Sequence, residues 1–133
     1  MEVLLVEPGK EARIAEIGDG LKSLQAAVGG WIEAIQPFDE PVALACNDEG
    51  KIMQMPLNRA LRGEDGKIYD AIAGPFFICG LGEDNFCSLP KELQAKYMEK
   101  FRWPEKFLVV GGNLVATQDK PRESARKPPS QER

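Results

Sequence analysis

Residues 24–35 constrain the fold more than any other segment of the chain. They combine the end of a short helix, two glycines and a strand that starts at once with a tryptophan. Apolar residues at helical spacing predict a helix over residues 20–28 with one buried face. Gly29 and Gly30 supply the left-handed backbone that ends a helix and that other residues disfavour. The sequence therefore predicts a tight helix-to-strand corner at this point.

The rest of the chain alternates short apolar runs with turn signals, which is typical of strands joined by short connections. The expected strands are residues 2–17 as a hairpin, 31–36, 42–46 with 51–54 as its hairpin partner, 67–71 and 76–80. Residues 55–62 are ambiguous, because Pro56 favours an extended chain while the residues after it could form one helical turn.

A second helix is predicted near the end of the chain. Ser88 can cap its start, Pro90 is tolerated in its first turn, and it should end near Arg102. Residues 107–110 could form a last strand or an apolar segment packed under this helix. The Gly-Gly-Asn that follows is expected to be a hairpin turn.

These elements predict an α+β fold: a mostly antiparallel sheet of about five to six strands with two helices on one face. Residues 1–117 should form a single globular domain. Residues 118–133 are rich in proline and charge and should form a disordered tail, because they cannot bury enough apolar surface to offset chain entropy.

The residue content excludes several chemistries. The sequence has no histidine, which removes the commonest general base and metal ligand. Its three cysteines show no Cys-x-x-Cys spacing, which argues against a disulfide framework or a zinc site. We therefore expect a protein that is not an enzyme, without cofactor, metal site or catalytic residues.

Charge and hydropathy restrict the partners. From Gln118 onward five basic and three acidic residues give a local net charge of +2, which leaves −6 on the remainder. An acidic body does not favour a direct nucleic-acid partner. The chain shows neither an apolar run long enough to span a membrane nor a secretory signal at its start, so a cytoplasmic location is expected.

Several short motifs together resemble one known family. They are residues 3–8, Leu24, Gln25, Val28, Gly29, Gly30, Ile32, Glu33, the triplet at 57–59, and residues 69–70 and 72–76. Over roughly residues 2–82 the set is similar to domain of unknown function DUF3846, a family of small bacterial and phage proteins. The resemblance implies an accessory protein of a phage, plasmid or conjugative element and brings no catalytic residues. Such proteins often block a host defence protein or sequester a signalling nucleotide.

Asn58, Arg59 and Arg62 form the one compact polar and basic cluster in the acidic body. If residues 58–62 form a helical turn, both guanidinium groups can lie on one side and grip a phosphate or carboxylate. Asn58 could then contact a base or ribose edge. The alternative is a loop whose arginines pair with neighbouring acids such as Glu64.

Trp31 and Glu33 complete the candidate site. The indole of Trp31 could stack on a ligand beside the two glycines, or it could pack in the core. Glu33 is a charge within a strand, so it needs either a solvent-facing side or a partner, for which Arg59 is the candidate.

We therefore expect a cytoplasmic binding protein of a phage or mobile element that counteracts host defence. Sequestration of a small anionic, nucleotide-type ligand ranks first. An inhibitor or adaptor on the surface of a host defence protein is the alternative, and a nucleotide-processing enzyme without histidine is a third. A homo-oligomer is compatible with each of them.

Overall fold

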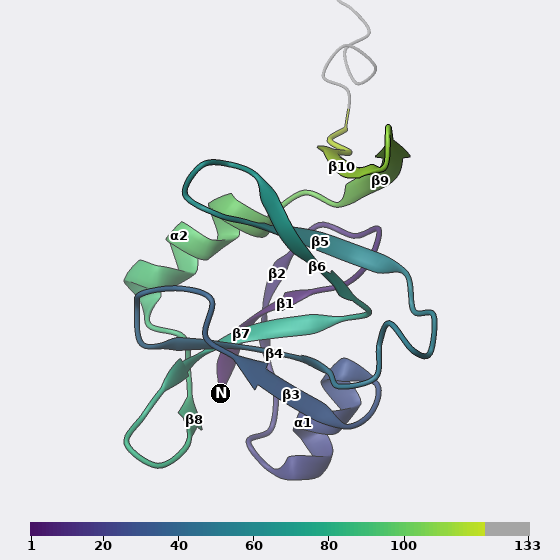
Figure 1. Cartoon of the computed structure of the whole chain (residues 1–133). Coiled ribbons are helices and arrows are strands. Elements are labelled where there is room, and N and C mark those ends of the chain that lie inside the picture. Colours follow the sequence, from purple (N-terminus) through teal and green to yellow (C-terminus); the bar gives the residue numbers. More distant parts are fainter. Residues whose placement is uncertain (122–133) are drawn as a thin grey trace, which may run out of the picture.

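A six-stranded antiparallel sheet forms the centre of the computed structural model, which describes residues 1–121 (Figure 1). Its strands are β1 (Glu2–Val6), β2 (Arg13–Glu16), β3 (Ile32–Ile35), β4 (Val42–Asn47), β7 (Phe76–Leu81) and β8 (Phe86–Cys87). They follow the order β2-β1-β7-β4-β3, with β8 on the end of β7, and every neighbouring pair is antiparallel. The predicted α+β class with a mostly antiparallel sheet of five to six strands is confirmed.

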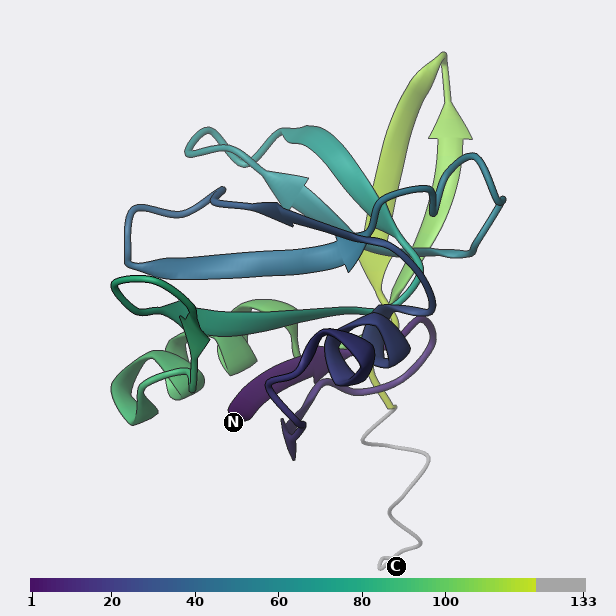
Figure 2. The same cartoon turned by 90° about the horizontal axis from the view of Figure 1, so that it is seen from below.

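Two further hairpins and two helices surround this sheet. The hairpins are β5 (Leu57–Arg62) with β6 (Ile68–Ala73), and β9 (Glu105–Val110) with β10 (Asn113–Gln118). The helices are α1 (Leu21–Val28) and α2 (Lys91–Phe101). Figure 2 shows the β9–β10 hairpin projecting away from the sheet and both helices.

The helices cover opposite faces of the central sheet, so the prediction that both lie on one face is wrong. Leu24 and Val28 of α1 pack with Val3, Leu5, Ala43, Ala45, Phe77 and Cys79. Tyr97 and Phe101 of α2 pack with Leu4, Val6, Leu44 and Ile78, a face that the β5–β6 hairpin also covers. Figure 1 shows α2 above the sheet and α1 below it. The reason is that β4 is buried along its whole length, so both of its faces require apolar cover.

The predicted helix-to-strand corner is confirmed. Gly29 has φ 79°, and its N–H donates to the carbonyl of Gln25 at 2.8 Å. The N–H of Gly30 donates to the same carbonyl at 3.0 Å, which closes the end of α1. The chain then enters β3 at Ile32.

The structure differs from the predictions at residues 51–54 and at Gln118. Residues 51–54 form turns and do not pair with β4, because β3 and β7 occupy both edges of that strand. Gln118, expected to begin the tail, is the last residue of β10. The remainder of the predicted tail falls mainly on residues 122–133, which lie outside the described part of the chain.

Candidate functional site

Arg59 lies inside the protein, and its guanidinium donates four hydrogen bonds to groups of the protein. Its Nε donates to the carbonyl of Phe101 at 2.9 Å and its Nη2 to the carbonyl of Lys10 at 2.7 Å. Its Nη1 donates to Oδ1 of Asn58 at 2.8 Å and to the Asn58 carbonyl at 3.2 Å. Burial lowers the pKa of the Arg59 guanidinium to about 10, an effect that the charge of Glu105 opposes. The group remains a buried cation at neutral pH.

Asn58 is also fully buried and completes a polar cluster that joins four segments. Its Nδ2 donates to the carbonyls of Val6 and Gly74, both at 2.9 Å. Together with Arg59 it ties the end of β1, the β6–β7 turn and the end of α2 to β5. Neither side chain is available to a ligand from solvent in this arrangement.

Contrary to the prediction, Arg59 and Arg62 are therefore not arranged to bind one phosphate or carboxylate together. Residues 57–62 form strand β5, so the helical turn that would align the two guanidinium groups is wrong. Arg62 donates from Nη1 to Glu105 Oε2 at 3.2 Å and from Nη2 to the carbonyl of Ala116 at 3.3 Å. The second Glu105 oxygen, Oε1, accepts the backbone N–H of Ala60 at 2.8 Å. This carboxylate is 4% exposed and fastens the base of the β9–β10 hairpin to β5.

Trp31 and Glu33 lie apart from the arginines. Trp31 is 68% exposed, so the alternative in which its indole packs in the core is wrong, and its carbonyl accepts the N–H of Asp48. Glu33 is exposed on the edge strand β3, and Arg59 is not its partner. Neither Trp31 nor Glu33 lines either of the two hollows beside Arg62.

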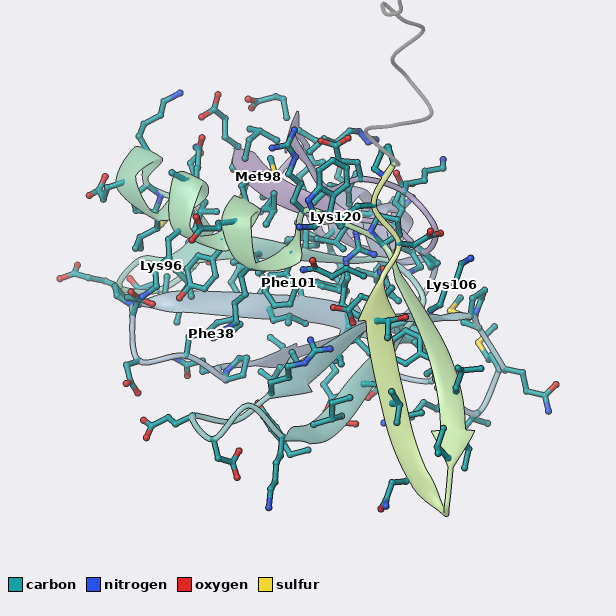
Figure 3. All side chains as sticks on the ribbon, turned by 90° about the horizontal axis from the view of Figure 1, so that it is seen from above. Phe38, Lys96, Met98, Phe101, Lys106 and Lys120 are labelled. Carbon is teal, nitrogen blue, oxygen red and sulfur yellow. The ribbon has the colours of Figure 1, made fainter. Side chains whose placement is uncertain are left out.

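The β9–β10 hairpin carries the most unusual surface of the described residues. Leu108, Val109 and Val110 are consecutive and are 61%, 72% and 57% exposed. Because residues directly opposite each other share a face, Leu108 and Val115 lie on one face and Val109 and Leu114 on the other. The hairpin is thus apolar on both faces. Figure 3 shows it extending from the body, with Lys106 near its base.

A hollow of about 560 Å³ lies between the loop before β4, the β5–β6 turn and α2. Arg62, Tyr69, Lys100, Phe38, Asp39 and Glu64 contribute to its walls. Figure 3 shows Phe38 beneath α2 next to Phe101, and their ring centroids are 6.1 Å apart. Arg62 is the one residue of the predicted site that reaches this hollow.

Glu40 holds one wall of this hollow in place. Its carboxylate accepts hydrogen bonds from the ammonium of Lys96 and from the hydroxyl of Tyr97. These two donors, the Lys96 ammonium foremost, lower the pKa of Glu40 below its ordinary 4.5. Burial and the nearby Glu40 charge raise the pKa of Tyr97, which therefore remains a neutral donor.

Replacing Glu40 with glutamine should remove a pH-dependent part of the stability. A carboxyl whose pKa is depressed in the folded state stabilises the fold above its unfolded pKa, and this stability is lost as the pH falls through the folded value. The Glu40→Gln variant should therefore be less stable than the wild type at about pH 7, and the difference should shrink toward about pH 3. Urea denaturation across this range measures it. Glu99→Gln, at an exposed site on α2, is the control and should leave the profile unchanged.

The hairpin turn expected at Gly111–Asn113 is confirmed, but sequence reasoning assigned no function to the hairpin, to Lys100 or to Tyr69. The sequence indicates an apolar hairpin here, because two apolar runs flank Gly111 and Gly112. The alternative for residues 107–110, an apolar segment packed under α2, is wrong, because these residues belong to strand β9. Lys100 had no local signal, and Tyr69 appeared only within a family motif, since the hollow that they share depends on segments far apart in the chain.

Within residues 1–121 no helix is long and apolar enough to cross a membrane. In the same part of the chain no group of three or more cysteine, aspartate or glutamate side chains is placed to hold a metal ion.

The family comparison gives one match. The model described as "Domain of unknown function (DUF3846)" matches residues 1–102 of the chain. This confirms the resemblance and extends it through α2, so the β9–β10 hairpin follows the matched part. No curated protein and no solved structure matches the chain.

Proposed function

The chain belongs to the DUF3846 family, and we propose that it is a non-enzymatic inhibitor that inserts its β9–β10 hairpin into a cleft of a partner protein. The observation that carries this proposal is the run of three exposed apolar residues Leu108, Val109 and Val110. A large apolar surface on a small protein marks a site of interaction with another molecule.

The geometry of the hairpin favours a cleft over a flat surface. Successive residues of a strand point to opposite faces, so Leu108 and Val109 cannot both be buried against a single plane. A cleft covers both faces of the ribbon at once. Full burial of a leucine or valine side chain contributes about 1.5–3 kcal/mol, so these three residues can supply a substantial part of the binding free energy, while the cost of association requires further contacts around them.

The body of the protein already orders the hairpin before any partner binds. Glu105 bonds to Ala60 and Arg62 at its base, and Asp119 N–H donates to the carbonyl of Pro104 at 2.7 Å where the chain leaves it. A pre-ordered element loses less conformational entropy on binding than a flexible one. An isolated two-stranded ribbon is only marginally stable in water, so a partner that covers it also stabilises it.

The class of partner follows from the family resemblance. An accessory protein of a phage or mobile element acts in the host cytoplasm, and a host defence protein is the target that such an element gains from blocking. Sequestration of a small ligand by Asn58, Arg59 and Trp31 has lost its support, because the first two are occupied within the fold and the third lies elsewhere.

The experiment places a photo-crosslinking residue at position 108 in a bacterial host that carries defence systems. We expect position 108 to crosslink to one host protein, which is then purified for binding measurements. Leu108→Asp with Val109→Asp should weaken that complex at least about 100-fold, as expected for residues at the centre of an interface. The same variant should abolish protection of a phage from the defence.

Ile52 provides the matched control, because it is 81% exposed on the loop after β4 and lies outside the hairpin. A crosslinker at position 52 and the Ile52→Asp variant should have no effect on the complex. Crosslinks to a second copy of the chain alone would show self-association instead. A host protein captured from position 52 but not from 108 would place the interface elsewhere and overturn the proposal.

A further inference from the structure

The hollow between α2 and the β5–β6 turn has the lining of a small-molecule site. Its volume of about 560 Å³ lies within the ordinary range for ligand pockets, about 300–1,000 Å³. We propose that it binds a nucleoside monophosphate or a ligand of the same chemistry: a phosphate, a hydroxyl-bearing ring and an aromatic base. This site is independent of the hairpin and of the inhibitor function proposed above.

Two cations on the hollow can hold the phosphate. Lys100 has no ion-pair partner among residues 1–121, and its Nζ lies 5.7 Å from the centroid of the Phe38 ring. Arg62 uses one hydrogen of each terminal nitrogen, toward Glu105 and Ala116, and both bonds are long at 3.2 and 3.3 Å. A guanidinium has five N–H donors, so these two acceptors leave three of them unused.

One exposed aromatic ring can hold the base. Tyr69 is 60% exposed although it borders the hollow, whereas Phe38 is half-buried and its ring already packs against Tyr97, Phe101 and Lys100. An exposed tyrosine beside a cation offers a flat face on which a base can stack. Lys96 is paired with Glu40, as Arg62 is with Glu105, so Lys100 is the lining cation without an ion pair among residues 1–121.

The acidic residues of the lining narrow the ligand class. Asp39 and Glu64 stand in the same hollow as Arg62 and Lys100. Carboxylates repel every phosphate, and a polyphosphate most strongly, but they accept hydrogen bonds from sugar hydroxyls. A ligand with one phosphate and a ribose therefore uses both kinds of lining residue, whereas inorganic phosphate uses only the cations.

Isothermal titration of the full chain with AMP, UMP, adenosine and inorganic phosphate tests this site. AMP should bind, UMP should bind more weakly because its smaller base stacks over less area, and adenosine and phosphate should each bind at least about tenfold more weakly than AMP. Lys100→Glu and Tyr69→Ala should each weaken AMP binding about tenfold or more without a change in melting temperature, since both side chains are exposed.

Lys22→Glu is the matched charge control, because Lys22 is exposed on α1, across the sheet from the hollow. It should leave AMP binding unchanged. The absence of binding by AMP and UMP at millimolar concentration would overturn the proposal, and so would an equal loss in Lys22→Glu and Lys100→Glu. The variant Leu108→Asp with Val109→Asp should bind AMP as the wild type does, which separates this site from the hairpin.

Discussion

Replacing Arg59 with alanine should lower the free energy of unfolding by about 3–5 kcal/mol, which is a large part of the stability of a domain of this size. The substitution empties a fully buried volume and removes the donors for the carbonyls of Phe101 and Lys10 and for the side chain of Asn58. Unsatisfied buried acceptors retain their full desolvation cost. Urea denaturation followed by circular dichroism measures the loss.

Two further variants test the reason for this loss. Arg59→Lys retains the charge, but its three donors radiate from a single nitrogen and cannot reach all the acceptors that Nε, Nη1 and Nη2 of Arg59 reach, so it should still lose at least about 2 kcal/mol. Arg13→Ala removes an arginine whose ion pair to Glu7 is largely exposed, and it should cost less than about 1 kcal/mol. If Arg59→Ala cost no more than Arg13→Ala, the buried cluster would not be structural, and the guanidinium would again be a candidate for binding.

Glu105→Ala should release the β9–β10 hairpin from the body and reduce stability by about 2–4 kcal/mol. The buried carboxylate accepts from Ala60 N–H and from Arg62, and its charge also favours the buried Arg59 cation. Without it, one backbone donor and one buried positive charge lose their compensation. Hydrogen exchange should accelerate most at the amides of β9 and β10, while β1 and β7 retain their protection.

The conservative variant separates charge from hydrogen bonding. Glu105→Gln keeps an acceptor for Ala60 N–H but loses the negative charge, so it should lose less stability than the alanine variant. Both variants should weaken binding of the partner protein, because the hairpin is no longer held in its pre-ordered position. Uniform acceleration of exchange over the whole domain would instead mean that Glu105 supports the core and does not act as a local fastener.

Local elements of the fold were predictable because their causes are local. The end of α1 follows from Gly29, whose backbone adopts the left-handed conformation that a residue without a β-carbon tolerates. The β1–β2 hairpin and the start of β3 follow from apolar runs bounded by turn residues. The Gly111–Gly112 turn is of the same kind, since both residues have positive φ.

The candidate site was less predictable because its residues depend on distant segments. Arg59 was predicted to lie at the surface. This prediction is correct for most arginines, because arginine is rarely buried. Its burial requires carbonyls from Lys10 and Phe101, which lie 49 and 42 residues away along the chain. The sequence around residues 55–62 gives no indication of these distant hydrogen-bond partners. Strand β5 and the burial of its side chains were therefore not predicted.

The α+β class, the helix-to-strand corner and the family could be predicted from the sequence, because periodicity, glycine positions and short motifs are properties of neighbouring residues. The positions of the helices on opposite faces, the burial of Arg59 and the projection of the β9–β10 hairpin from the body became clear only from the folded structure. These outcomes depend on which faces of β4 and β7 need cover and on which distant groups satisfy a buried cation. Such pairings are settled by packing and hydrogen bonding across the whole chain.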